Sequence, residues 1–164
     1  MPEAQFKDVE KDDLKRLNEM VNDAEVSQYL NLIPPLPMEK TEAFFKHVGE
    51  LGGKWWCIIN GGKTVGSVGL LPDGPGTKLA HSASFFIYLV KEVRGRGFGK
   101  AAMEHMLSEG RKRGYERIQC TVVKDNRKAV DLYLSVGFEI EGIKRRAFKD
   151  GVEYHDMLVM GMLL

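Results

Sequence analysis

The sequence predicts an α/β protein, with a three-layer α/β/α fold built around a mixed, mostly antiparallel central sheet. Strand-like apolar runs recur along the whole chain, and helix-like runs with apolar residues three or four positions apart lie between them. Gly, Pro and Asp mark the turns that separate these runs. The chain has 164 residues, 43% of them hydrophobic. Because a domain usually takes about 100–200 residues, we expect a single domain over residues 1–164.

In the first half of the chain, a short strand and two helices are expected before a pair of strands. Asp12 or Asp13 is placed to cap the first helix, which runs to Val21 with apolar residues at helical spacing. The prolines of residues 30–37 exclude both a helix and a central strand there. Gly61-Gly62 is a hairpin turn between two strands. The expected strands are 5–9, 54–60 and 63–71, and the second helix is 38–51.

In the second half, strands and helices alternate. A Pro/Gly loop over 71–77 precedes a strand that is apolar enough to be central. Asp150-Gly151 turns the chain between the last two strands. The expected strands are 82–90, 117–123, 138–147 and 152–162, and the expected helices are Phe98 to about Arg113 and 126–136.

Composition and charge narrow the classes of function. With 24 Lys and Arg against 23 Asp and Glu, no overall field favours nucleic acid or an anionic membrane as a partner. No apolar run approaches the length of a membrane span, and the N-terminus lacks a signal-peptide core. Cys57 and Cys120 lie in separate strand-like runs, which indicates buried thiols and a cytoplasmic protein. The four histidines show no metal-binding spacing, so no metal is expected.

The most informative segment is the glycine-rich stretch that opens the helix at Phe98. Its glycines alternate with larger residues, so the main chain is bare where basic side chains gather, and the helix directs its positive end there. This combination predicts a pyrophosphate site. The segment consists of Arg94, Gly95, Arg96, Gly97, Phe98, Gly99 and Lys100.

Two familiar nucleotide motifs do not account for this segment. A Walker A loop needs Ser or Thr after its Gly-Lys pair, and Ala101 follows Lys100 here. A dinucleotide fingerprint needs G-x-G-x-x-G near the start of a βαβ unit, whereas these glycines read G-x-G-x-G beyond the middle of the chain.

Two ordered motifs instead resemble those of the GCN5-related N-acetyltransferase (GNAT) superfamily. Arg94, Gly97 and Gly99 match Q/R-x-x-G-x-G/A, and residues 126–138 match N-x-x-A-x-x-x-Y-x-x-x-G-F. The resemblance covers nearly the whole chain. Within the family, the N-terminal third is similar to the branch that acetylates ribosomal-protein alanine N-termini and polyamines. The resemblance therefore implies the acetyltransferase fold and the transfer of acetyl from acetyl-CoA to a primary amine.

The resemblance also implies where acetyl-CoA binds. The pyrophosphate would lie on residues 94–100, and pantetheine would pair with the main chain of Ile87, Tyr88 and Leu89. Asn126 and Lys128 would contact the cofactor as well. Each assignment has a structural alternative: residues 87–89 are core strand in any case, and Asn126 is a good helix cap. Lys124, Arg127 and Lys128 are equally suited to the 3′-phosphate or to an exposed helix start.

The resemblance implies that Tyr133 also lies at the cofactor, as the general acid that protonates the leaving thiolate. The alternative is an ordinary core aromatic. The general base stays open: the strand at 82–88 carries no carboxylate, which leaves Glu139, Glu141 or a water chain through Ser84, Tyr88 or His81. This missing carboxylate keeps a second function open, a non-catalytic acyl-CoA-binding sensor.

The proline segment is expected to form a wall of the acceptor site, with Tyr29 and Leu32 contacting a small-molecule or peptide amine. It is too apolar for a free surface loop, and its prolines make it stiff. The alternative is that Leu32, Ile33 and Leu36 pack into the core or into a homodimer interface.

Overall fold

The computed structural model describes residues 3–164. Its helices are α1 (Leu14–Val21), α2 (Ala24–Ser27), α3 (Met38–Glu50), α4 (Phe98–Lys112) and α5 (Arg127–Ser135), with 3-10 turns η1 (Lys11–Asp13) and η2 (Lys91–Val93). Its strands are β1 (Gln5–Asp8), β2 (Lys54–Asn60), β3 (Lys63–Pro72), β4 (Ser82–Leu89), β5 (Arg117–Val123), β6 (Glu139–Asp150) and β7 (Glu153–Leu163).

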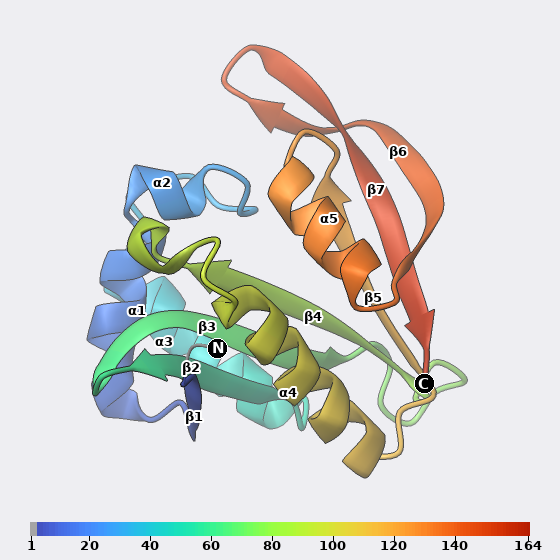
Figure 1. Cartoon of the computed structure of the whole chain (residues 1–164), viewed down its shortest axis with the longest axis horizontal. Coiled ribbons are helices and arrows are strands. Elements are labelled where there is room, and N and C mark those ends of the chain that lie inside the picture. The colour runs from blue at the N-terminus through green and yellow to red at the C-terminus, as the bar shows by residue number, and fades with distance from the viewer. Residues whose placement is uncertain (1–2) are drawn as a thin grey trace.

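The strands form one sheet in the order β1-β2-β3-β4-β5-β7-β6 (Figure 1). Within the described chain, neighbouring strands are antiparallel except β4 and β5, which are parallel. A parallel pair needs a crossover connection, and η2, the glycine-rich segment and α4 provide it. The expected mixed, mostly antiparallel sheet is confirmed.

Helices cover both faces of the sheet, so the expected three layers are also confirmed. On one face, Met103 and Met106 of α4 pack with Tyr133 of α5 against Phe85. On the other face, which we call the α1–α3 face, Leu17 and Val48 of those two helices pack with Trp55 and Tyr88. Figure 1 shows α4 and α5 in front of the sheet and α1 and α3 behind it.

Three local features differ from expectation. Asp13 does not cap α1 with its side chain; its carboxylate accepts the amide of Glu10 at 2.8 Å and closes the η1 turn instead. The short helix α2 was not expected, because four residues are too few to show helical spacing. Strand β6 continues to Asp150, beyond the expected Ala147, and pairs with β7 to form a long hairpin.

The two cysteines are buried and free, as expected. Burial raises the pKa of Cys57 to about 11 and that of Cys120 to about 12. Across residues 3–164, no helix has the length and apolar character needed to cross a membrane.

Candidate active site

The central feature of the site is the place where β4 and β5 separate. Their parallel pairing joins Ser82 to Arg117, Ala83 to Ile118 and Ser84 to Gln119. Beyond that point β4 continues to Leu89, still paired with β3, and β5 continues to Val123, still paired with β7. Figure 1 shows the two strands diverging toward their C-terminal ends. The sheet therefore opens into a V, whose vertex is the Ser84–Gln119 pair.

Alternation along β4 decides which main-chain groups face the open V. The amide of Val90 donates to Val65 and the carbonyl of Ser82 accepts from Asp73, so even-numbered residues direct their main chain to β3. The odd-numbered residues Ile87 and Leu89 then face the V, as the resemblance implied. Tyr88 does not: its main chain is turned toward β3, so the expectation that it pairs with pantetheine is wrong.

The loop after η2 presents unpaired amides at the mouth of the V. Gly95 and Gly97 have φ of 71° and 88°, a left-handed conformation that glycine adopts without strain. Gly97 precedes α4 without a side-chain cap. In residues 3–164, no hydrogen-bond acceptor meets the amides of residues 95–100. Since α4 also directs its positive dipole end at this point, the loop is suited to bind an anion.

Arg94 lies at this loop, but its guanidinium is held by the protein. It donates to the Leu89 carbonyl at 2.9 and 3.1 Å and to the Glu25 carbonyl at 2.7 Å. Lys91 makes an ion pair with the Glu25 carboxylate at 3.1 Å. These contacts fasten α2 to the loop. Arg94 therefore ties this loop to α2 and to the end of β4, and the Leu89 carbonyl is already occupied.

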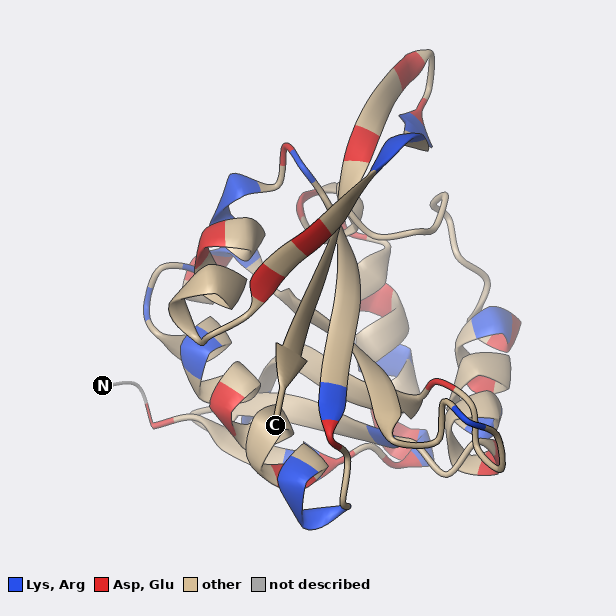
Figure 2. Ribbon diagram, turned by 90° about the vertical axis from the view of Figure 1, so that its right-hand side faces the viewer, with Lys and Arg blue, Asp and Glu red and all other residues tan. Residues whose placement is uncertain are grey.

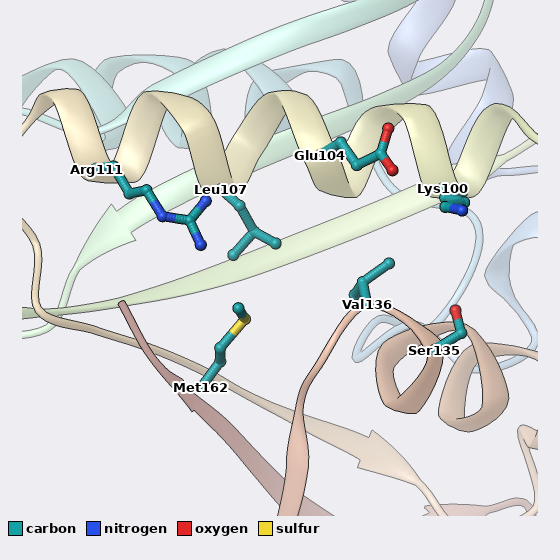
Figure 3. Close-up of a pocket in the computed structure, with 7 residues that line it drawn as sticks. All are labelled: Lys100, Glu104, Leu107, Arg111, Ser135, Val136 and Met162. Atoms are coloured by element: carbon teal, nitrogen blue, oxygen red, sulfur yellow. The ribbon is translucent and has the colours of Figure 1, made fainter.

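The first turn of α4 is packed closely against α5. A Cβ on Gly99 would lie 2.9 Å from a terminal methyl carbon of Leu132, so a larger residue at position 99 would require the Leu132 side chain to shift. The Arg96 guanidinium lies 5.7 Å from the ring of Phe98, which is buried. Lys100 faces outward, at one end of a groove of about 410 Å³ between α4 and the end of α5 (Figure 3).

At the start of α5, the helix-capping role expected for Asn126 is observed. Its side chain accepts the amide of Ala129 at 3.4 Å. Lys124, Arg127 and Lys128 are exposed around this helix start. Their exposure is compatible with both roles considered from the sequence.

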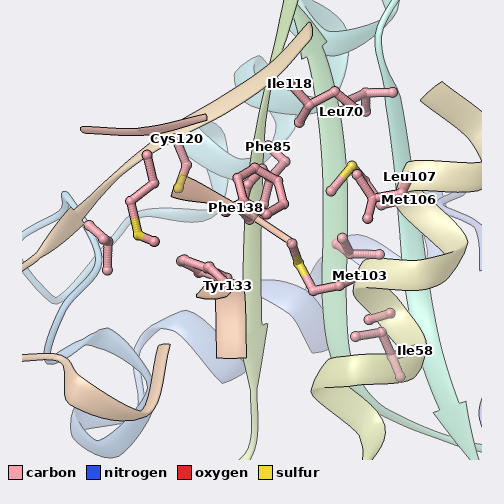
Figure 4. Packing of buried hydrophobic residues seen from close by; sticks show 14 of the residues in the cluster. Ile58, Leu70, Phe85, Met103, Met106, Leu107, Ile118, Cys120, Tyr133 and Phe138 are labelled. Atoms are coloured by element: carbon pink, nitrogen blue, oxygen red, sulfur yellow. The ribbon is translucent and has the colours of Figure 1, made fainter. Parts of the chain in front are cut away.

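Tyr133 of α5 lies beside the vertex of the V (Figure 4). Its ring meets that of Phe85, the residue after Ser84, edge-on at 5.1 Å. Only 7% of Tyr133 is exposed, and burial raises its pKa, so the hydroxyl stays protonated. It has no hydrogen-bond partner within residues 3–164. Among these residues, the only fully buried side-chain nitrogen or oxygen without a hydrogen-bond partner is Nε2 of His105. The Tyr133 hydroxyl, which also has no partner, is therefore not fully buried and reaches solvent.

The proline segment borders the opposite side of the sheet. Leu32 and Leu36 are half-buried against the α1–α3 cluster, whereas Ile33 is 89% exposed. The Leu36 main chain is held by the side chain of Asn22, whose Oδ1 accepts the Leu36 amide at 2.6 Å and whose Nδ2 donates to the Leu36 carbonyl at 3.1 Å. Tyr29 is half-buried. The core alternative therefore holds for Leu32 and Leu36 and fails for Ile33, while Tyr29 keeps an accessible surface.

The base candidates from the sequence separate in the structure. Glu141 is bound by Arg117, which lowers the pKa of its carboxyl group, and Glu139 is exposed. Tyr88 is buried, which raises its pKa. The structure instead brings a carboxylate that sequence reasoning missed to the vertex: Asp73, directly after β3, accepts hydrogen bonds from Ser84 and Gln119. The sequence places Asp73 in a Pro/Gly loop, and nothing in that pattern indicates that its carboxylate reaches β4 and β5.

The β6–β7 hairpin extends beyond the end of β5 (Figure 2). Met157 is the partner of Val123, so the next residues of the hairpin lie past the β5 side of the V. There a depression of about 700 Å³ is lined by Ile143, Arg145, Arg146 and Asp156. The Arg146 guanidinium stacks on Tyr154 at 4.0 Å, and the Arg146 amide donates to Asp156 at 2.8 Å.

Comparison with known proteins places this site in context. The model of the acetyltransferase (GNAT) family matches residues 17–138. Spermidine N(1)-acetyltransferase of Escherichia coli is 24% identical over 98% of this chain and 87% of its own length. The E. coli [ribosomal protein bS18]-alanine N-acetyltransferase is 29% identical over 51% of this chain and 57% of its own.

Human N-acetyltransferase 8B is 31% identical over 58% of this chain, but the chain spans only 43% of that relative's length. Among solved structures, spermidine N-acetyltransferase of Vibrio cholerae, in complex with CoA and spermine, superposes with a TM-score of 0.87. It covers 98% of this chain and 95% of its own at 23% identity, and so shows the fold.

Proposed function

Since this chain belongs to the GNAT family of acetyltransferases, whose members use acetyl-CoA, we propose that it moves acetyl directly from acetyl-CoA to a primary amine. One observation carries the proposal: β4 and β5 separate between an unpartnered phenol beside the vertex of the V and unpaired amides at its mouth. These are the groups that a thioester donor with a pyrophosphate needs. Its acetyltransferase relatives disfavour the alternative of a non-catalytic sensor.

Each residue has a defined part in this proposal. The amides of residues 95–100 bind the pyrophosphate, with Lys100 nearby and Lys128 at the opposite helix start. The main chain of Ile87, with the Leu89 amide, pairs with pantetheine as an additional strand would. Because the pyrophosphate lies at the mouth, the thioester lies deeper, toward Phe85 and Tyr133.

The reaction requires two proton movements. The acceptor ammonium, with a pKa of about 10.4, loses a proton before its nitrogen attacks the thioester carbonyl. The carbon–sulfur bond then breaks, and Tyr133 is placed to donate its proton to the sulfur. Transfer from a phenol to a thiolate is uphill in water, where their pKa values are about 10 and 8.5. Burial raises the pKa of the Tyr133 phenol as well as that of a thiol, so burial does not remove this difference and the transfer stays uphill.

On the acceptor side, Tyr29 and the proline segment form a wall of the amine site in this proposal. Arg94 and Lys91 tie α2 to the cofactor loop, so the start of this segment is fixed relative to the donor. A stiff apolar wall loses little conformational entropy when an amine binds.

Tyr29→Ala is expected to raise KM for the amine several-fold and to leave KM for acetyl-CoA unchanged. Tyr29 is the better probe of this wall, because Leu32 also packs against the core and Leu32→Ala would cost stability. Steady-state kinetics with each substrate varied in turn provide the measurement. Leu163→Ala, at a position that is 77% exposed and outside the proposed wall, is the matched control. Equal effects of Tyr29→Ala on both KM values would assign Tyr29 to packing.

Between the acceptors that the relatives use, the hairpin favours the N-terminal amine of a peptide over a polyamine. A polyamine carries further positive charges, and the depression in the hairpin is lined by two cations, Arg145 and Arg146, against one carboxylate, Asp156, so its lining is net positive. A peptide N-terminus carries one charge, followed by backbone carbonyls that accept from guanidinium groups.

We expect coenzyme A release to be at least about tenfold faster with short peptides than with spermidine, since charge repulsion of about 1.4 kcal/mol suffices for that ratio. Arg145→Glu should narrow the ratio by improving spermidine, while Lys149→Glu, nearer the hairpin turn, should change it less. A thiol-release assay over a panel of peptides and amines is the measurement. A preference for spermidine that Arg145→Glu leaves unaltered would contradict this choice of acceptor.

A further inference from the structure

The Asp73 carboxylate is the centre of a polar cluster at the vertex of the V. Ser84 donates its hydroxyl to Oδ1 of Asp73 at 2.5 Å, and Ser82 donates to Oδ2 at 2.5 Å. Gln119 donates its side-chain amide to Oδ2 at 2.9 Å. Ser84 and Gln119 are the last pair joined across β4 and β5. The carboxylate therefore touches both strands at the point where they separate.

The cluster lies on the acceptor side of the sheet. Even-numbered residues of β4 point to the α1–α3 face, where Phe86 and Tyr88 belong to the same apolar cluster as Leu32 of the proline segment. Tyr133 packs on the other face, against Phe85. A thioester at the vertex would thus have the Tyr133 hydroxyl on one side and the Ser84 hydroxyl on the other.

The hydrogen bond to Asp73 fixes which way the Ser84 hydroxyl can act. A hydroxyl has one proton to donate and two lone pairs to accept with. Because an ionised carboxylate only accepts, the proton of Ser84 is directed at Asp73 and its lone pairs are directed away from it. Ser84 is half-buried and retains an accessible surface, whereas Ser82 is only 4% exposed. Ser84 therefore presents a hydrogen-bond acceptor to whatever enters the vertex.

We propose that Ser84 and Asp73 form the proton relay for the acceptor amine. Ser84 accepts a hydrogen bond from the amine and takes its proton, while the hydroxyl proton of Ser84 passes to Asp73. The amine nitrogen is left with a free electron pair for attack on the thioester carbonyl. Ser84 contacts the substrate, and Asp73 is a positioning residue that acts through it. This inference rests on the direct transfer proposed above.

The relay supplies the carboxylate that is missing from β4. The sequence of β4 has a serine and no acidic residue near the vertex, and the acidic group comes from the end of the neighbouring strand. The charge of Asp73 acts on Arg117 and on Tyr115, so both of these side chains lie near the carboxylate. Arg117 is bound by Glu141, so its positive charge is already paired and Asp73 is left to the serines and Gln119.

Four single variants separate the relay from packing. Ser84→Ala and Asp73→Asn are each expected to lower kcat/KM for the amine by about 10²-fold, the low end of general acid–base contributions. Ser82→Ala removes a hydroxyl from the same carboxylate without touching the vertex, and should stay within a few-fold of wild type. Glu139→Gln removes an exposed carboxylate that does not contact Asp73 and should do the same. The affinity for acetyl-CoA, measured by calorimetry, should be unchanged in all four.

Two further variants test the chemistry directly. Ser84→Thr restores a hydroxyl and should recover most of the activity that Ser84→Ala loses. The double variant Ser84→Ala/Asp73→Asn should be no slower than the slower single variant, because residues that act as one unit are not additive. The relay is wrong if Ser84→Ala keeps wild-type activity, if Ser82→Ala loses as much, or if acetyl-CoA affinity falls in parallel. Coenzyme A release by the wild type tests the proposed transfer separately.

Discussion

Gly97→Val is expected to abolish acetyl-CoA binding. The residue has a φ of 88°, which a β-branched side chain does not adopt without strain. To relieve that strain, the loop must rotate, and the amides of residues 95–100 would no longer point at one anion. A valine side chain would also stand where the pyrophosphate approaches the main chain.

The matched control is Gly114→Val. Gly114 has a similar left-handed φ of 81°, but it lies just past the C-terminal end of α4, far from residues 95–100. Each substitution strains the main chain beside α4, Gly97→Val at its N-terminal end and Gly114→Val at its C-terminal end. Only Gly97→Val should eliminate acetyl-CoA binding. Calorimetric titration with acetyl-CoA and thermal unfolding of both variants provide the measurement. If folded Gly97→Val binds acetyl-CoA with the affinity of the wild type, the pyrophosphate lies elsewhere.

Tyr133→Phe is expected to lower kcat by about 10²-fold while acetyl-CoA affinity is retained. The ring continues to fill its place against Phe85 and Phe138, so packing is preserved. Only the hydroxyl is lost, and within residues 3–164 it makes no contact whose removal would disturb the fold. We place the effect at the low end of general acid catalysis because proton transfer from a buried phenol is uphill.

The control for this variant is Tyr115→Phe, which removes the hydroxyl of a tyrosine whose pKa is also raised by burial. Tyr115 lies in the turn between α4 and β5, away from the mouth of the V, and the turnover of this variant should match the wild type. Steady-state kinetics, together with calorimetric affinity for acetyl-CoA, separate chemistry from binding. If Tyr133→Phe turns over at the wild-type rate at every pH, Tyr133 contributes only to packing and is not the general acid.

The elements of the fold were predictable because periodicity and turn residues carry most of the local information. All the expected strands and long helices are present, and β6 was underestimated because its outer half is exposed and lacks a clear apolar pattern. The short α2 escaped prediction because four residues are too few to show helical spacing. Its position matters, since Arg94 and Lys91 bind to Glu25 across nearly seventy residues of sequence.

The site was predictable where a motif carries main-chain geometry, and unpredictable where side chains meet across strands. The glycines that open α4 indicated its bare amides, and Asn126 indicated a cap. By contrast, the main-chain N–H and C=O of Tyr88 point to β3 and not to the V, and this depends on the register between β3 and β4. The approach of Asp73 to Ser84 and Gln119 depends on how three strands end together, and no spacing in the sequence expresses that.

The most direct test of the central claim is a crystal structure of the acetyl-CoA complex. The account predicts that the pyrophosphate accepts hydrogen bonds from the amides of residues 95–100, and that pantetheine pairs with Ile87 between β4 and β5. It also predicts that the thioester sulfur lies within hydrogen-bonding distance of the Tyr133 hydroxyl. A thioester located in the groove between α4 and the end of α5, or any pose with the V empty, would contradict it.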